Sequence, residues 1–186
     1  MGKKVVITNK FADAIAGGWK ISGIFTAYSG TPFTVSGSGS SLQATGNSQT
    51  ADLIGPVNKL GGKGPGNPYY APLSFIDPLI YYNQNGVYRF GTTGRNILRG
   101  PGYWQLSPAI YKDFRIREKV NAEFRAEATN LTNTPIWGNP NAGSANLRRN
   151  PDGSLNTTVT DPLQNFMCIT SATAGRQFRF GLRLAF

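Results

Sequence analysis

The chain has 186 residues, of which 23 are Gly and 12 are Pro, so about one residue in five breaks helices. Charged residues make up only 15%, which is below the usual quarter. This composition argues against a helical bundle and favours β-structure with long loops. Because no run approaches the roughly 18 consecutive apolar residues of a membrane helix, a helical membrane protein is also excluded.

The formal net charge is +10, from 19 Lys and Arg against 9 Asp and Glu. An excess of this size is found in proteins that bind nucleic acids or anionic surfaces. The basic residues are scattered, however, and the adjacent pairs Lys3-Lys4 and Arg148-Arg149 form no stripe. We therefore expect no nucleic-acid partner. A basic nucleic-acid binder is kept only as the least favoured of three candidate functions.

Side chains for catalysis or metal binding are scarce. There is no His, the commonest general base and metal ligand. Cys168 is the single Cys, which leaves neither a disulfide framework nor a Cys-rich metal site. We expect no enzymatic activity, no cofactor and no metal, and we assign Cys168 to packing. The apolar run in residues 1–8 is too short for a signal peptide.

The first predicted strand covers residues 18–35, in which apolar side chains alternate less cleanly than elsewhere. A Gly-, Ser-, Asn- and Pro-rich loop follows over residues 36–102. The Gly-rich run 61–66 lacks the spacing of a phosphate-binding loop and is predicted to be a flexible loop tip. The loop as a whole is too polar for a packed helix.

Two further strands are predicted at residues 103–115 and 120–131, because apolar and polar residues alternate in both. A helix would mix the two sets, since its faces repeat every 3.6 residues. Residues 115–119 form a short charged connection, so the two strands make a hairpin. A second long polar loop covers residues 132–173, and a last strand with strict alternation covers residues 174–186.

The loop lengths are unequal at the two ends of the predicted strands. Compact soluble domains rarely carry two such long loops, whereas outer-membrane barrels have short turns at one end and long loops at the other. A tilted strand of about ten residues also spans about 25 Å, the height of the apolar band of such barrels. Aromatic residues fall where interfacial girdles are expected. They are Trp19, Tyr103, Trp104 and Phe114.

The alternation by itself fits an antiparallel sandwich equally well. The alternative is therefore a secreted soluble β-sandwich that binds glycans through aromatic residues of its loops. These residues are Tyr69, Tyr70, Tyr81, Tyr82 and Trp137. Loop asymmetry and the terminal aromatic favour an all-β antiparallel transmembrane β-barrel segment.

The polar face of the 120–131 strand carries charges of both signs. Two Glu four residues apart could serve as an acid–base pair, but a structural ladder with the last strand explains them more simply, because opposite charges across strands stabilise a sheet. The lumen-facing ladder is predicted from Glu123, Arg125, Glu127, Arg179 and Arg183.

Three segments resemble one protein family when taken in order: residues 17–33 (GGWKISGIFTAYSGTPF), 90–102 (FGTTGRNILRGPG) and 124–135 (FRAEATNLTNTP). They resemble the C-terminal end of TonB-dependent outer-membrane receptors, in particular the Oar-like group that carries a carboxypeptidase-regulatory-like domain. The resemblance covers nearly the whole chain and is weakest in the loops.

The resemblance implies that the chain supplies the last four strands of a barrel of roughly 22 strands, with a bacterial outer-membrane location. The implied partners are outer-membrane lipid, the remainder of the barrel and its plug, the barrel-insertion machinery, and the TonB system acting through the plug. Four strands form an incomplete barrel, so this segment is not expected to transport alone. The last strand resembles the signal read by the insertion machinery. The matching residues are Phe178, Phe180, Leu182, Leu184 and Phe186.

Overall fold

A computed structural model describes residues 17–43, 48–117, 120–173 and 175–186. The expectation for residues 1–8, and the tip of the predicted turn at 118–119, lie outside the described residues. The chain forms two compact units, which are described separately. The sheet unit comprises Met1–Ala27, Tyr103–Pro135 and Ala174–Phe186, and the loop unit comprises Tyr28–Gly102 and Ile136–Thr173.

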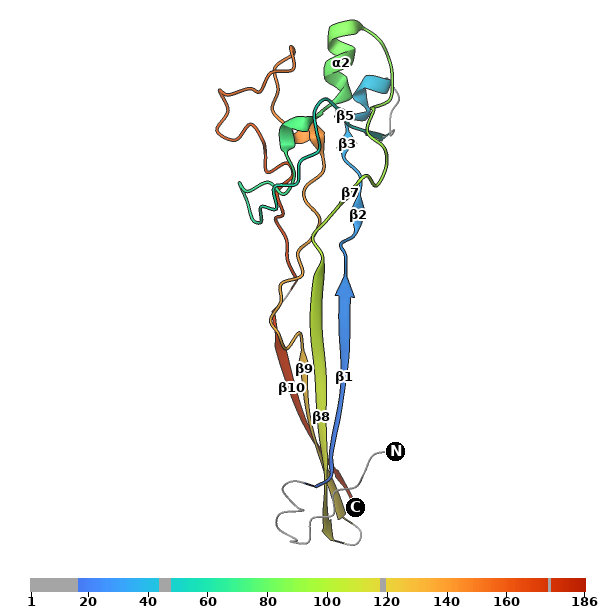
Figure 1. Cartoon of the computed structure of the whole chain (residues 1–186), viewed down its shortest axis with the longest axis vertical. Helices are drawn as coiled ribbons and strands as arrows, with labels where there is room; N and C mark the ends of the chain where they lie inside the picture. The colour runs from blue at the N-terminus through green and yellow to red at the C-terminus, as the bar shows by residue number, and fades with distance from the viewer. Residues whose placement is uncertain (1–16, 44–47, 118–119, 174) are drawn as a thin grey trace. The chain divides into compact units, whose positions relative to one another are not determined.

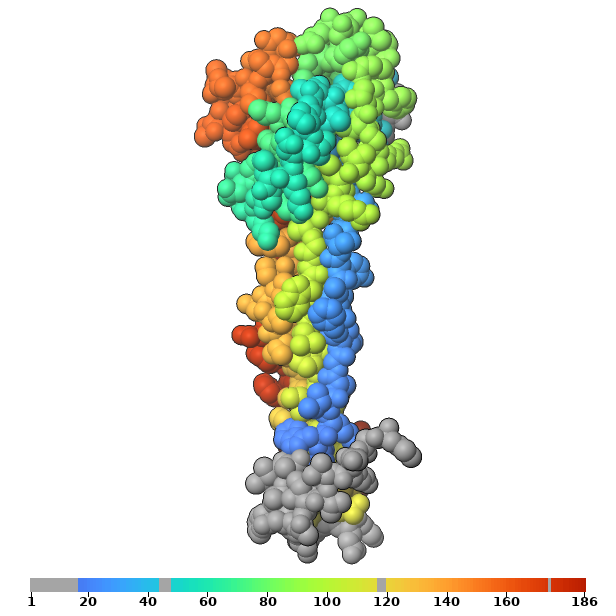
Figure 2. Space-filling view, in the orientation of Figure 1, coloured from blue at the N-terminus to red at the C-terminus, as the bar shows by residue number. Residues whose placement is uncertain are grey.

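The sheet unit contains one four-stranded sheet in the order β1-β8-β9-β10 (Figure 1). Its strands are β1 (Trp19–Tyr28), β8 (Tyr103–Arg117), β9 (Val120–Thr129) and β10 (Gln177–Ala185). β9 is antiparallel to both β8 and β10, and Figure 2 shows β1 (blue) and β8 (yellow-green) side by side. The all-β antiparallel prediction is confirmed. Within the described residues the sheet does not close, as expected for an incomplete barrel.

The register keeps the alternation of the strands in phase. Ala126 of β9 lies opposite Ile110 of β8 and Phe180 of β10. Because successive side chains point to opposite faces of a sheet, these three apolar side chains lie on the same face. The regular pairing is broken between Arg115 and Arg117, next to the short connection. Irregularities of this kind are common at sheet edges and barrel rims.

The predicted strand 18–35 is interrupted in the structure. β1 ends at Tyr28, and the chain resumes as the short strand β2 (Pro32–Phe33) in the loop unit. Gly30 has φ +97°, and a Cβ at this position would lie 2.2 Å from the carbonyl oxygen of Gly100. This close approach requires glycine and turns the backbone out of the strand, while Pro32 has no amide hydrogen to donate to a ladder.

The loop unit is built from short pairs of strands and short helices. The pairs are β2 with β7 (Leu98–Arg99), β3 (Ser36–Gly37) with β4 (Gln49–Thr50), and β5 (Asp52–Leu53) with β6 (Phe75–Ile76). The helices are η1 (Gly39–Leu42), η2 (Pro72–Ser74), α2 (Pro78–Asn85) and η3 (Ser144–Asn146).

α2 corrects the prediction that the first loop is too polar for a packed helix (Figure 1). The carboxylate of Asp77 accepts a hydrogen bond from the Leu79 amide at 2.9 Å, and Pro78 occupies the first helical position. Gly86 ends the helix in the left-handed conformation, and its amide donates to the Tyr82 carbonyl. These are standard start and stop signals. They specify a short helix even where the composition is polar.

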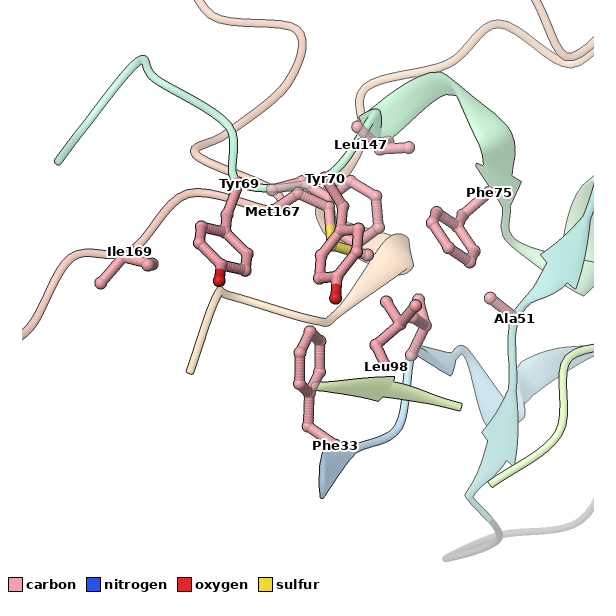
Figure 3. Close-up of a cluster of buried hydrophobic side chains, with 11 residues drawn as sticks. Phe33, Ala51, Tyr69, Tyr70, Phe75, Leu98, Leu147, Met167 and Ile169 are labelled. Atoms are coloured by element: carbon pink, nitrogen blue, oxygen red, sulfur yellow. The ribbon is translucent and has the colours of Figure 1, made fainter. Parts of the chain in front are cut away.

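The loop unit has its own hydrophobic core. The rings of Phe75 and Phe166, both fully buried, meet edge to face with centroids 6.2 Å apart. Figure 3 shows these buried side chains converging from β2, β6, β7 and the segments around Tyr69 and Met167. The cluster comprises Phe33, Val35, Ala51, Tyr69, Tyr70, Phe75, Leu98, Leu147, Phe166, Met167 and Ile169.

The Gly-rich run 61–66, predicted to be a flexible tip, is held by hydrogen bonds. The Gly64 amide donates to the Ile169 carbonyl at 3.1 Å, and the Gly66 amide donates to Oδ1 of Asn165 at 3.0 Å. The glycines allow the backbone to fold onto the 165–169 segment. The two predicted loops are therefore joined into one folded unit.

Candidate functional site

The apolar face of the sheet is formed by rows from neighbouring strands. Phe178, Phe180, Leu182 and Leu184 of β10 lie opposite the apolar row of β9. All four are between 55% and 70% exposed. Since burying each such side chain is worth about 1.5–3 kcal/mol, this face is unfavourable in water and favourable against hydrocarbon.

Phe186 follows the last residue of β10 and is fully exposed. It continues the alternation of the apolar row by one position beyond the strand. The predicted assembly residues thus share one face and one edge of the sheet.

The opposite face carries the predicted charged ladder. The register places Glu127 opposite Arg179 and Glu123 opposite Arg183. Arg125 lies between the two Glu residues and forms an ion pair with Glu127 along the same strand, with Nε 2.8 Å from Oε1. The structure therefore brings all five predicted residues together on one polar face, where opposite charges alternate across the strands.

Two residues extend this polar face towards β1. Lys20 Nζ lies 2.7 Å from Oδ2 of Asp113, and Asp113 lies opposite Glu123 in the register of β8 and β9. Asp113, Glu123 and Arg183 line a depression of about 350 Å³. The polar face is thus charged across all four strands, as a water-filled lumen allows.

Lys112 lies on the apolar face of β8 and was missed by the sequence reasoning. It is only 3% exposed, and its ammonium lies 4.6 Å from the centre of the Trp19 ring and 5.2 Å from that of Phe114. Two aromatic faces stabilise a cation at such distances. The sequence does contain a signal for this site, because Lys112 occupies an even-numbered position of β8, where the other residues of the row are apolar.

The predicted interfacial aromatics fall into two groups in the structure. Trp19 and Phe114 contact the same lysine, Lys112. Trp104 packs against Phe25 of β1, with ring centroids 6.2 Å apart, and Tyr103 begins β8. Their position at a membrane interface remains a prediction.

The aromatic residues assigned to glycan binding in the sandwich alternative are not one surface. Tyr69 and Tyr70 are buried in the loop-unit core, and the Tyr70 hydroxyl donates to the Arg99 carbonyl at 2.9 Å. The Tyr81 ring is covered by the guanidinium of Arg89 at 3.8 Å. This correction removes two of the five residues from any surface that a ligand can reach.

Arg89 also forms a two-pronged ion pair within the loop unit. Its two terminal nitrogens contact the two carboxylate oxygens of Asp52 at 2.7 and 2.8 Å. The Asp52 side chain is 5% exposed, and the hydrogen bond to it raises the pKa of Arg89. This two-pronged pair fixes segment 89–92 against β5.

Cys168 is 2% exposed and lies beside the loop-unit core. Burial raises the pKa of its thiol above the ordinary value, so the thiol is protonated and unreactive at neutral pH. Within residues 17–43, 48–117, 120–173 and 175–186, no group of three or more His, Cys, Asp or Glu side chains is arranged to hold a metal ion.

None of the helices in the described part of the chain is both long and apolar enough to cross a membrane.

Comparison with protein families matches residues 1–179 to the outer membrane beta barrel domain. This match covers β1, β8, β9 and the start of β10 together with both long connections. No curated protein and no solved structure matches the chain. The match agrees with the two-faced sheet, and it places the protein in the bacterial outer membrane, in contact with its lipid. The chain belongs to the outer membrane β-barrel domain family.

Proposed function

We propose that this chain is the C-terminal part of the barrel of a TonB-dependent outer-membrane receptor of the Oar-like group. It contributes barrel wall and two extracellular loops that help to bind a scarce substrate, and it is not an enzyme. The proposal is supported by the motifs at 17–33, 90–102 and 124–135, which occur in the order found in that family. Membership of the outer membrane β-barrel family supports it further.

The observation that carries the proposal is the register of the sheet. Across β9 and β10, the four large apolar residues of β10 lie opposite apolar residues, and Arg179 and Arg183 lie opposite Glu127 and Glu123. One face therefore suits lipid and the other suits a polar lumen. Soluble monomeric proteins rarely expose a continuous apolar face of this length.

The connections suggest how the sheet is oriented. β8 and β9 are joined by a short connection, whereas long segments join β1 to β8 and β9 to β10. In outer-membrane barrels short turns face the periplasm and long loops face outward. The loop unit, which is made from both long segments, is accordingly extracellular and belongs to the substrate-binding side.

The sheet must be completed by further strands. In the described residues, β1 and β10 each have one neighbour, so each leaves an edge for strand addition, and a barrel removes such edges by closing. The complete receptor supplies those strands and the plug through which TonB delivers energy. This segment alone does not transport.

β10 is proposed to carry the assembly signal read by the insertion machinery. It offers an open edge and a row of exposed apolar side chains ending at Phe186. An unpaired edge strand is a template for strand addition. The same residues later form part of the lipid-facing wall.

The sandwich alternative has less support. A sandwich covers the apolar face of one sheet with a second sheet, but the large side chains of β10 are exposed. Two of the tyrosines assigned to its glycan surface, Tyr69 and Tyr70, are buried.

The test uses the complete protein, produced with its plug and remaining strands. We expect it to fractionate with outer membranes, to migrate differently on gels with and without heating, and to be retained by the immobilised periplasmic domain of TonB. A matched sample without the plug should still insert but should not be retained. A protein that inserts and fails to bind TonB would be another kind of outer-membrane barrel, and one that stays soluble would not be a barrel.

A further inference from the structure

The loop unit contains an open cavity of about 720 Å³, and most of the residues that line it have polar side chains. Its floor is the β3–β4 pair, and one wall is the segment between Phe90 and Asn96. The size is that of a small-molecule site. The lining includes Thr34, Ser36, Thr50, Phe90, Arg95 and Asn96.

The wall beside the floor is held by the backbone. The Gly91 amide donates to Oε1 of Gln49 at 3.1 Å, and the Thr50 hydroxyl donates to the Gly91 carbonyl at 3.2 Å. The Thr93 amide donates to the Ala51 carbonyl at 3.0 Å. A Cβ at Gly91 would lie 1.9 Å from the carbonyl oxygen of Thr50, so this crossing requires glycine. Phe90 and the residues after it are thereby fixed at the rim.

A second set of hydrogen bonds fixes the far end of the wall. The Asn96 amide donates to the Thr34 hydroxyl at 2.9 Å, and that hydroxyl donates to Oδ1 of Asn96 at 3.3 Å. Asn96 has φ +57°, a turn conformation that Asn tolerates better than most residues. The cavity is therefore formed before any ligand arrives, which reduces the entropy lost on binding.

The cavity lining combines an exposed aromatic ring, neutral polar groups and one arginine. Phe90 is 69% exposed although it is a large aromatic residue, and it stands beside hydroxyl and amide groups that donate and accept hydrogen bonds. Arg95 is exposed and has no ion pair among the described residues, and the lining contains no carboxylate. An aromatic ring suits the C–H face of a sugar, neutral polar groups suit its hydroxyls, and an unpaired Arg suits a carboxylate.

We propose that this cavity binds an acidic oligosaccharide, with a sugar ring stacked on Phe90 and a sugar carboxylate paired with Arg95. The hydroxyl hydrogens of Thr34 and Thr50 are already donated within the protein, so these two oxygens accept hydrogen bonds from the sugar hydroxyls, and the side-chain NH2 of Asn96 donates to those hydroxyls. The inference rests on the proposed receptor function and names its substrate class.

The test is isothermal titration calorimetry on the complete barrel protein in lauryldimethylamine oxide micelles, a detergent without sugar groups. The probes are hexagalacturonate and hexaguluronate as acidic sugars and maltohexaose as a neutral one. We expect at least one acidic probe to bind, and Phe90→Ala and Arg95→Gln each to weaken that binding by about tenfold or more. Maltohexaose should bind at least about tenfold more weakly than the acidic probe.

Two control variants separate binding from folding. Arg148→Gln removes an exposed cation of the same unit away from the cavity, and Phe180→Ala removes an exposed ring of the sheet. Both should bind as the unchanged protein does. The emission of Trp137, which packs against the loop-unit core, checks that each variant is folded.

Three results would overturn the inference: no binding of either acidic probe, equal binding of maltohexaose, or unchanged binding by folded Phe90→Ala and Arg95→Gln. Binding in micelles needs neither TonB nor uptake. A negative result here would therefore leave the receptor function standing, and failure to bind TonB would leave the sugar site standing.

Discussion

The sheet unit and the loop unit place their apolar side chains in opposite ways. In the sheet unit most of the large apolar residues are exposed, and the buried hydrophobic residues of its described part are Ala122 and Ala128. In the loop unit Phe75, Phe166 and Ile169 are fully buried. The same chain therefore exposes large apolar side chains in one unit and buries them in a core in the other.

The difference teaches that the two units fold in different solvents. Water drives apolar groups inward and builds a core from irregular segments. Lipid removes that driving force, so the sheet is specified by backbone pairing and by which face meets hydrocarbon. Matched changes in the two units should therefore have different consequences.

The largest effect is expected at the loop-unit core. Phe75→Ala removes a fully buried ring that packs against Phe166 and should lower the unfolding free energy of the loop unit by about 3–5 kcal/mol. Trp137 emission during urea unfolding is the measurement, with Trp19 and Trp104 replaced by Phe. Phe180→Ala is the control and should leave this transition unchanged. An equal loss in both variants would mean that the units unfold together.

A smaller loss of unfolding free energy is expected when a charge is placed on the apolar face of the sheet. Phe124→Arg puts a charge on the apolar face of β9 and should cost about 2–4 kcal/mol in a bilayer, whereas Arg125→Phe on the polar face should cost less. The measurement is urea unfolding of the complete barrel in lipid vesicles. Equal sensitivity of the two positions would argue against a division between lipid and lumen.

Deletion of Phe186 should separate assembly from stability. Its fully exposed ring adds one girdle aromatic to the finished barrel, so the unfolding midpoint should hardly change. Insertion into outer membranes should fall several-fold if the insertion machinery reads this residue. Yield and midpoint are measured on the same variant. An undiminished yield would make Phe186 a lipid-facing residue only.

The smallest effect concerns Cys168. Because burial raises the pKa of its thiol, the protonated form is favoured in the folded loop unit. This preference adds to the unfolding free energy of the loop unit. The added stability is fully present below the ordinary thiol pKa of about 8.5, and it is lost as the pH rises through the higher pKa of the thiol in the folded protein. The unfolding free energy of the loop unit should thus decrease above about pH 8.5, and Cys168→Ala should remove this decrease.

Alkylation provides a second measurement of the same residue. Iodoacetamide should label Cys168 slowly in the folded protein at about pH 8 and quickly in urea. Rapid labelling without urea would contradict the buried position.

Much of the sheet could be predicted because period-2 alternation is a local property of each strand. The alternation in residues 120–129 separated Phe124 from Arg125, and the register agrees with that separation. Lys112 shows the limit, since the alternation does not predict the packing of Trp19 and Phe114 around this lysine in an apolar row. The signals for α2, Asp77-Pro78 and Gly86, were local too, but the polar composition around them concealed a helix.

The sequence by itself determined the two faces of the sheet, because alternation in an extended chain leaves each side chain one face to occupy. It did not determine the loop unit, where Phe75 meets Phe166 and Arg89 pairs with Asp52 across 37 residues. Such contacts depend on how distant, irregular segments close upon each other, and no local period encodes that closure. The cavity at Phe90 and Arg95 belongs to this second class, since its floor and wall come from β3, β4 and the segment that crosses them at Gly91.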